Sequence, residues 1–407
     1  DKSPSKGPSY FFWMNKIDLR SAFRSENRTD SNTWLEVLLK ELHTPFIQNY
    51  DTLDKNLIDQ AGLPPLFKFV LVAPPQASGA FEIVFGVHHA IADGMAGITL
   101  FRDFLELLSE AIHSNATPII LEEEVDPKIH QCQPLDLLLD IRPTVWNLLK
   151  AVAALDFPIL KATRKDWLGP PQVASPHRTS RLVLAHIPKQ EIDALLQKCR
   201  SHHVTLNAAM YAATNFAVAK TLKRYPVISG HTACNLRSYC QPKLPPNTTG
   251  TFVCGPETCF SLHGKINFWE FARQAKKHQV AAVQDAYRKI GMLNFLSSVH
   301  EFFEKKRKAV PNGRDATLDL SNLGSIPFPE SFQCFSLKGC YFANAKTAEG
   351  PVIMESVVTV QGTLYLTLGY VEQILTREEA ETIVKYILEA LKKCEDKQLN
   401  LQDFISS

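Results

Sequence analysis

The stretch Phe81-Glu-Ile-Val-Phe-Gly-Val-His-His-Ala-Ile-Ala-Asp-Gly94 decides the fold, because two periodicities meet in it. Large apolar residues alternate before the histidines, which predicts a strand. Beyond Gly94 apolar residues recur every three or four positions, which predicts a helix whose inner face carries Gly97, Phe101, Phe104, Leu105, Leu108 and Ile112. Asp93 can cap this helix. We therefore expect His88 and His89 where a strand ends, in a turn that presents side chains from a rigid scaffold.

The histidine pair is the strongest candidate for chemistry in the chain. The sequence has no Gly-x-Ser-x-Gly elbow, no Gly-x-x-x-x-Gly-Lys phosphate loop and no Gly-x-Gly-x-x-Gly after a strand. Their absence argues against covalent serine chemistry and against dinucleotide binding. A neutral imidazole can accept a proton from a hydroxyl or an amine, and typically contributes about 10² to 10⁴ in rate. We interpret His89 as a general base at a cleft.

Other interpretations of the same residues stay open at this point. Imidazole and carboxylate are common metal ligands, so His88, His89 and Asp93 could belong to a metal site. Adjacent side chains on a strand point to opposite faces, which disfavours two neighbouring histidines on one ion, and we expect no metal. Asp93 is better explained as a helix cap or an ion-pair partner than as a direct catalyst.

Strand and helix patterns alternate along the chain without repeats, which predicts an α/β fold, or α+β in two layers. Strands are expected at 66–72 and 180–187, a hairpin around Gln361-Gly362, and helices starting near Lys189, Thr205 and Thr376. A chain of 407 residues exceeds one ordinary core, so we expect two lobes. These are 1–165 and 181–407, joined by a crossover at 166–180 that is rich in Pro, Gly and Ser.

Composition narrows the partners and the location. The net charge is only +2, so we expect no nucleic-acid partner. Nine cysteines at no zinc or redox spacing favour reduced thiols in the cytoplasm. The start of the chain lacks the apolar core of a signal peptide. The apolar stretch at 145–160 is interrupted by polar residues, which favours a packed helix over a membrane span, and we expect no transmembrane segment.

His88-His89-x-x-x-Asp93-Gly94 resembles the His-His-x-x-x-Asp-Gly signature of the condensation-domain superfamily. This superfamily includes chloramphenicol acetyltransferase, plant BAHD acyltransferases, wax ester synthases, alcohol acetyltransferases and peptide-synthetase condensation domains. Three further segments resemble its landmarks in the same order: Pro64-Pro65-Leu66-Phe67-Lys68-Phe69, Asn235-Leu236-Arg237-Ser238-Tyr239 and Leu320-Ser321-Asn322-Leu323-Gly324. The last resembles the Ser-Asn-x-Gly strand end of the alcohol acetyltransferase branch.

The resemblance implies two chloramphenicol-acetyltransferase-like lobes with an active-site tunnel between them. His89 would deprotonate the acceptor for direct attack on an acyl thioester, without an acyl-enzyme. Asp93 would pair with Arg237 and hold the loop in shape, with His88 and Gly94 as further structural residues at the site. Polar groups of Ser321 and Asn322, next to Gly324, would bind substrate and stabilise the oxyanion.

The expected activity is transfer of an acyl group from coenzyme A to an alcohol or amine, with acyl-coenzyme A as co-substrate and no bound cofactor. Lys305-Lys306-Arg307-Lys308 is interpreted as a solvated helix face, with contact to coenzyme A phosphates as the alternative. The rivals are a condensation-like domain that uses an acyl group on a carrier protein, and a catalytically silent docking module. A monomer is expected.

Two departures from the superfamily pattern qualify the resemblance. The Asp-Phe-Gly-Trp-Gly motif of the plant enzymes is absent, with Ser321-Asn322-Leu323-Gly324 in its expected place, which argues against BAHD membership in the narrow sense. Family domains begin with a strand and a helix ahead of the region of Phe11, and the chain offers little sequence for them. The first lobe is therefore expected to be incomplete at its start.

Overall fold

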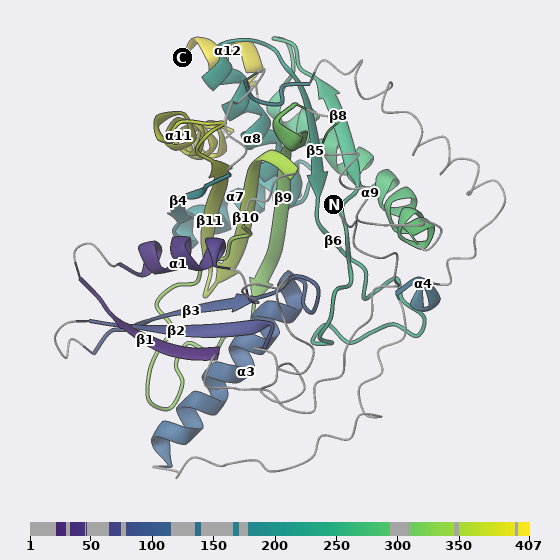
Figure 1. Cartoon of the computed structure of the whole chain (residues 1–407). Helices are drawn as coiled ribbons and strands as arrows, with labels where there is room; N and C mark the ends of the chain where they lie inside the picture. The colour runs from purple at the N-terminus through teal and green to yellow at the C-terminus, as the bar shows by residue number, and fades with distance from the viewer. Residues whose placement is uncertain are drawn as a thin grey trace, which may run out of the picture. The chain divides into compact units, whose positions relative to one another are not determined.

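The computed structural model describes residues 22–29, 33–44, 46, 65–74, 79–114, 135–139, 166–170, 178–293, 308, 311–345, 350–394 and 398–407 (Figure 1). The expected helix at 145–160 and residues 171–177 of the expected crossover lie outside this part of the chain, as do Lys305, Lys306 and Arg307. The chain divides into two compact units, Asp1–Phe101 with Thr249–Thr251, and Arg102–Thr248 with Phe252–Ser407. The lobe boundary at 166–180 stays a prediction.

The first unit is built on a three-stranded sheet in the order β1-β2-β3. β1 (Phe23–Asn27) runs parallel to β2 (Phe67–Ala73), and β2 runs antiparallel to β3 (Glu82–Val87). The strands expected at 66–72 and 81–87 are thus confirmed to within one residue. In the described residues of this unit, the helices are α1 (Trp34–His43) and the start of α3 (Gly94–His113).

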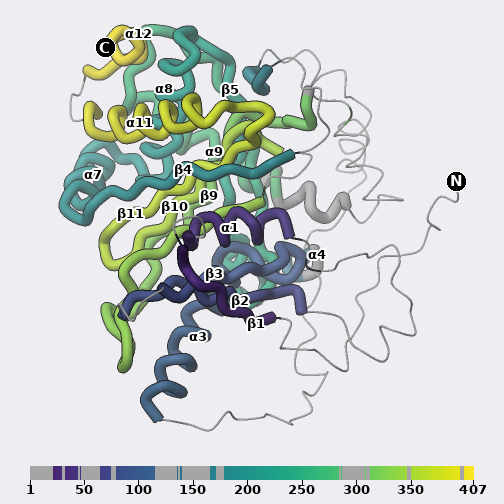
Figure 2. Tube along the Cα trace, turned by 60° about the vertical axis from the view of Figure 1, so that its left-hand side comes forward, coloured from purple at the N-terminus to yellow at the C-terminus, as the bar shows by residue number. Residues whose placement is uncertain are grey.

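The two faces of this sheet differ in chemistry. One face is aliphatic, and its core consists of Val37 from α1 with Val70, Val72 and Val84 from the strands. The other face is aromatic: the rings of Phe23, Phe69, Phe85 and Phe101 follow one another at centroid distances of 5.1, 4.6 and 5.9 Å. Since alternate strand residues point to opposite faces, α1 and α3 cover opposite sides of the sheet, as Figures 1 and 2 show.

The second unit is built on a six-stranded mixed sheet. Its order is β4 (Ser180–Ile187), β11 (Thr363–Val371), β10 (Gly350–Val360), β9 (Arg314–Ile326), β5 (Val227–Thr232) and β8 (Glu257–Ser261). β9 is parallel to both of its neighbours, and the other pairs are antiparallel. The helices that the structure describes here are α4 (Leu135–Leu138), α7 (Lys189–Ser201), α8 (Leu206–Leu222), α9 (Phe268–Leu293), α11 (Arg377–Lys393) and α12 (Leu401–Ser406). A short ladder joins β6 (Cys234–Asn235) to β7 (Val253–Cys254).

α8 is the central helix of this unit. The sequence indicates one apolar side with Ala208, Ala209, Ala212 and Phe216, but every residue from 208 to 220 is buried. The Phe216 ring contacts Phe268 and Phe271 of α9 and Phe404 of α12. The expectation that only one side of α8 is buried was therefore wrong, because α8 is enclosed by other helices as well as by the sheet.

Most of the expected elements are confirmed. β4, the start of α7, the β10–β11 hairpin at Gln361-Gly362 and the Thr376–Glu379 capping box are present. One detail was wrong: Ile112 is 50% exposed rather than on the inner face of α3. A further helix, α12, follows α11. The mixed α/β class is as predicted. Among the helices of the described residues, none combines the length and apolar character needed to cross a bilayer.

Candidate active site

The histidine turn begins directly after β3. The backbone N–H of His88 donates to the Leu66 carbonyl at 2.8 Å, which continues the β2–β3 ladder by one bond. The N–H of Ile91 then donates to the His88 carbonyl at 3.0 Å, and the N–H of Ala90 donates to His88 Nδ1 at 3.1 Å. The His88 ring is therefore part of the turn itself, because one of its nitrogens accepts a backbone hydrogen bond.

His89 occupies the exposed tip of this turn. Its carbonyl accepts a hydrogen bond from Thr251 Oγ1 at 2.9 Å, which fixes its backbone. Within the described residues, no hydrogen bond engages its imidazole. Our argument from strand alternation was wrong, because both histidines lie beyond Val87, the last residue of β3. The turn sets the two side chains apart instead: a backbone N–H engages the ring of His88, and the ring of His89 is left open.

Asp93 is the cap of α3, as predicted. Its side chain is almost fully buried, and Oδ1 accepts from the backbone N–H of Ala96 at 2.9 Å. The backbone N–H of Asp93 donates to the Gly250 carbonyl at 3.0 Å. Gly94 is the first residue of the helix. Asp93 thus stabilises the start of α3 and anchors the end of the histidine turn.

Residues 249–251 contact the turn and were missed by sequence reasoning. Gly250 and Thr251 contribute the carbonyl and the hydroxyl that hold Asp93 and His89. Gly250 has a φ of 132°, a conformation that L side chains rarely adopt. The one available signal was a glycine directly after the polar run Asn247-Thr248-Thr249. We name residues 249–251 the clip.

Arg237 braces the segment that leads to the clip. Arg237 is 2% exposed, and its Nε and Nη2 donate to the Thr248 carbonyl at 3.0 and 2.8 Å. Nη1 donates to Asn235 Oδ1 at 3.1 Å, and the group lies 4.8 Å from the centre of the Phe252 ring. Arg237 therefore joins the two ends of the 235–252 segment. Its expected pairing with Asp93 stays a prediction.

Ser321, Asn322 and Gly324 lie inside β9, where we expected a strand end or a loop. The strand continues to Ile326, because β10 pairs with Ser321 and Asn322 and again with Ser325 and Ile326. A register shift opposite Val357 to Thr359 marks a bulge, and Gly324 has a φ of 74° there. Asn322 Oδ1 accepts from the Gly324 N–H at 2.8 Å, which leaves its Nδ2 amide as the donor.

The position of Ser321 along β9 marks a change in pairing. β5 pairs with β9 only through Leu320, so the β5-side edge of β9 leaves that ladder from Ser321 onward. From Ser321 onward β9 is therefore paired with β10 on one side but no longer with β5 on the other. A strand paired on one side only can accommodate turn-prone residues. Such an edge can present polar groups to a ligand.

A histidine–aspartate pair lies next to this segment and was also missed. His231 Nδ1 lies 2.7 Å from Asp319 Oδ1, across the β5–β9 ladder. Burial favours the neutral imidazole, but the hydrogen bond and charge of Asp319, with the charges of Asp315 and Glu257, outweigh it and raise the pKa of His231. The pair joins residues 88 positions apart, so no sequence spacing could indicate it. Among the described residues, no group of three or more His, Cys, Asp or Glu side chains is placed to hold a metal ion.

Residues 57–393, most of the chain, match the family model described as alcohol acetyltransferase. The chain belongs to the alcohol acetyltransferase family. A relative from Aspergillus fumigatus, named probable alcohol acetyltransferase crmB, is 22% identical over 393 residues, which is 90% of this chain and 78% of that protein. Family membership confirms the branch that the Ser-Asn-x-Gly segment indicated.

Solved structures share the fold of this alcohol acetyltransferase family member at low identity. TRI3 trichothecene 15-O-acetyltransferase from Fusarium sporotrichioides has a TM-score of 0.62 at 13% identity, with 91% of this chain and 76% of that chain covered. The epimerization domain of tyrocidine synthetase module TycB3 has a TM-score of 0.57 at 15% identity, with 95% and 81% covered. The first condensation domain of the CDA synthetase has a TM-score of 0.55 at 9% identity, with 94% and 76% covered. The predicted condensation-domain-like fold is thereby confirmed.

Proposed function

We propose that this alcohol acetyltransferase family member moves an acyl group from acyl-coenzyme A to a hydroxyl acceptor, with His89 as general base and without an acyl-enzyme. The observation that carries the proposal is the difference between the His89 imidazole and the other polar groups of the turn in their hydrogen bonding. Both histidines of the turn are exposed, but the His88 ring accepts from Ala90 and the Asp93 carboxylate from Ala96, whereas no hydrogen bond within the described residues engages the imidazole of His89. A base must be free to meet its substrate while its backbone is fixed.

In the proposed reaction, a neutral His89 imidazole accepts the proton of the acceptor hydroxyl. The hydroxyl oxygen attacks the thioester carbonyl and gives a tetrahedral oxyanion, to which the Asn322 amide and the Ser321 hydroxyl are proposed to donate. Collapse breaks the carbon–sulfur bond, and the imidazolium returns the proton to the departing coenzyme A sulfur. Loss of one such oxyanion donor typically costs about 3 to 4 kcal/mol in the transition state.

The test is thiol release from a panel of acyl-coenzyme A donors with alcohols and amines, for the wild type and His89→Ala. We expect His89→Ala to lower the turnover number by about 10² to 10⁴. His88→Ala is the matched neighbour: it removes a turn hydrogen bond but no base, so its effect should be far milder. Undiminished turnover in His89→Ala would exclude this residue as the base.

A carrier protein is the second candidate for the acyl donor, favoured by the fold shared with condensation and epimerization domains. The two donors present the same thioester on a phosphopantetheine arm, so the same His89 chemistry would serve both. Competition separates them: acyl-coenzyme A and the same acyl group on a carrier protein are offered at equal concentration. Turnover confined to the carrier-bound donor would overturn the coenzyme A proposal and retain the role of His89.

A further inference from the structure

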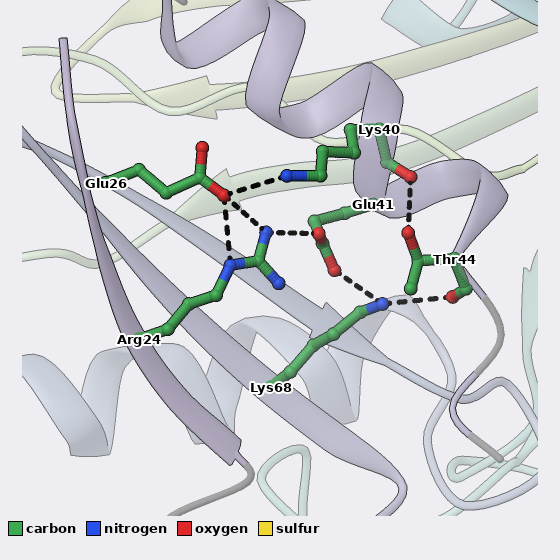
Figure 3. Close-up of polar contacts among 6 residues, drawn as sticks. All are labelled: Arg24, Glu26, Lys40, Glu41, Thr44 and Lys68. Carbon is green, nitrogen blue, oxygen red and sulfur yellow. Dashed lines mark hydrogen bonds and ion pairs between the residues drawn. The ribbon is translucent and has the colours of Figure 1, made fainter. Parts of the chain in front are cut away.

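A buried ion cluster lies on the α1 side of the first unit (Figure 3). Its centre is Glu41 of α1, whose side chain is 3% exposed. Arg24 of β1 donates to one carboxylate oxygen, and Lys68 Nζ of β2 lies 2.5 Å from the other. Glu26 and Lys40 extend the cluster toward solvent, where Lys40 Nζ contacts Glu26 at 3.2 Å and is 63% exposed.

Lys68 reaches from this cluster toward the histidine turn. Its stem covers Gly86, which is its partner on β3, so closely that a Cβ there would lie 3.2 Å from Lys68 Cε. Its ammonium donates to the Thr44 carbonyl at 3.0 Å and lies 4.7 Å from the centre of the Phe46 ring. The charge is therefore held by a carboxylate, a carbonyl and an aromatic face, and only 13% of the side chain is exposed.

Phe46 completes the connection, because its ring meets the ring of His88 edge to face at a centroid distance of 5.7 Å. His88 is the residue whose Nδ1 accepts the Ala90 N–H and so shapes the turn before His89. An unbroken series of contacts thus leads from Glu41 through Lys68 and Phe46 to His88. Lys68 thus contacts Thr44 at the end of α1, and Phe46 contacts the His88 ring.

We propose that Lys68, held by Glu41, is a positioning residue that orients the His88 ring through Phe46 and thereby fixes the turn that presents His89. The inference rests on the proposed function for its kinetic consequence, but the orientation of His88 is measurable without it. A surface ion pair would not do this, since two mobile side chains hold no fixed geometry. Lys68 has a fixed place because three acceptors converge on its ammonium.

The test uses Lys68→Met, which keeps most of the stem and removes the charge, with Lys68→Arg as the conservative variant. We expect Lys68→Met to lower kcat about 3- to 10-fold with little change in either KM, because a small misplacement of the base affects the reaction more than binding. Lys68→Arg should restore kcat to within about twofold. Lys40→Met is the matched control from the exposed edge of the same cluster, and should behave as wild type.

Coupling through His88 is tested by a double-mutant cycle. If Lys68 acts through this ring, Lys68→Met should cost nothing further in a His88→Ala background. Phe46→Leu removes the ring between Lys68 and His88 but leaves the ion pair of Lys68 with Glu41 intact. It should therefore lower kcat as Lys68→Met does, while the free energy of unfolding stays near that of the wild type. Additive effects of Lys68→Met and His88→Ala would overturn the proposal, and so would a Phe46→Leu variant with wild-type kcat.

A measurement independent of activity separates this inference from the proposed function. In ¹⁵N-labelled histidine spectra, assigned with His88→Gln and His89→Gln, we expect Lys68→Met and Phe46→Leu to shift the His88 Nδ1 signal. Lys40→Met should leave it unchanged. A shifted signal in a protein that shows no acyl transfer would refute the function and retain the coupling. An active protein with an unshifted signal and unchanged kcat would refute the coupling and retain the function.

Discussion

Two buried glutamates, one in each unit, are held in opposite ways. The Glu41 side chain is 3% exposed, and burial alone would raise its pKa, but Arg24 and Lys68 outweigh burial and lower it. Glu355 of β10 is fully buried, meets no cation in the part of the chain that the structure describes, and has its pKa raised to about 8. Glu355 lies deeper in its core than Glu41 does, so burial raises its pKa more strongly and no cation offsets it, whereas two cations outweigh burial at Glu41.

The contacts of Glu355 agree with a proton on its carboxyl group. Thr214 Oγ1 lies 2.5 Å from Glu355 Oε2 and 3.1 Å from the Met210 carbonyl of its own helix. A hydroxyl has one proton, so if Thr214 donates to Met210, Glu355 must be the donor to Thr214. The comparison teaches that this chain uses a buried charge beside the histidine turn and a buried neutral acid in the core of the second unit.

Removing the ionised glutamate should have the largest effect on stability. Glu41→Gln leaves Lys68 without its carboxylate, and we expect the free energy of unfolding at pH 7 to fall by about 3 kcal/mol. Because the folded-state pKa of Glu41 is lowered, its contribution is present above the unfolded pKa and lost as pH falls through the folded value. Urea unfolding between pH 3 and 7 should therefore show a flatter acid limb in the variant, and equal limbs would refute the ion-pair account.

Removing the neutral glutamate should have a smaller effect with the opposite sign and pH dependence. The pKa of Glu355 rises from its ordinary value of 4.5 to about 8 in the fold. Between these two pH values the folded chain keeps a proton on Glu355 that the unfolded chain releases. Stability from this group is complete below pH 4.5 and is lost as pH rises toward 8. Glu355→Gln should gain on the wild type by about 1.4 kcal/mol for each pH unit inside this window, which is about 2 kcal/mol between pH 5.5 and 7. A constant difference across this range would show that Glu355 is ionised in the fold.

An exposed ion pair on the protein surface should have the smallest effect on the free energy of unfolding, and it serves as the reference for the two buried glutamates. Arg377 and Glu381 form an ion pair at 2.7 Å on α11, with side chains 84% and 51% exposed. Glu381→Gln should change the free energy of unfolding by less than about 0.5 kcal/mol, because water already solvates both groups. A loss as large as that of Glu41→Gln would mean that burial does not set the difference between these pairs. Thermal unfolding at low and moderate salt provides the comparison.

The histidine turn shows how much of the site the sequence could predict. The change from alternating to three-and-four spacing located the end of β3, the cap Asp93 and the start of α3 to the residue. Local periodicity carries this information because strand and helix impose it on neighbouring residues. The clip was not predictable in the same way, since Thr251 meets His89 from 162 residues away.

The segments that sequence reasoning misjudged are those where distant pairing overrides local preference. Ser321 to Gly324 has the composition of a turn, but its pairing with β10 extends β9 through it. Glu41 lies in an ordinary amphipathic helix, and nothing near it in sequence shows that Lys68 meets it from β2. The family resemblance located the segments in order, whereas the contacts that give each residue its role come only from the fold.

The most direct test of the account is chemical rescue of His89→Ala by free imidazole, followed as thiol release from an acyl-coenzyme A donor. If His89 is the general base, the variant should be nearly inactive alone, and its rate should rise in proportion to the concentration of neutral imidazole. His88→Ala, which lacks a turn contact rather than a base, should gain nothing from imidazole. Wild-type turnover of His89→Ala without imidazole would contradict the central claim.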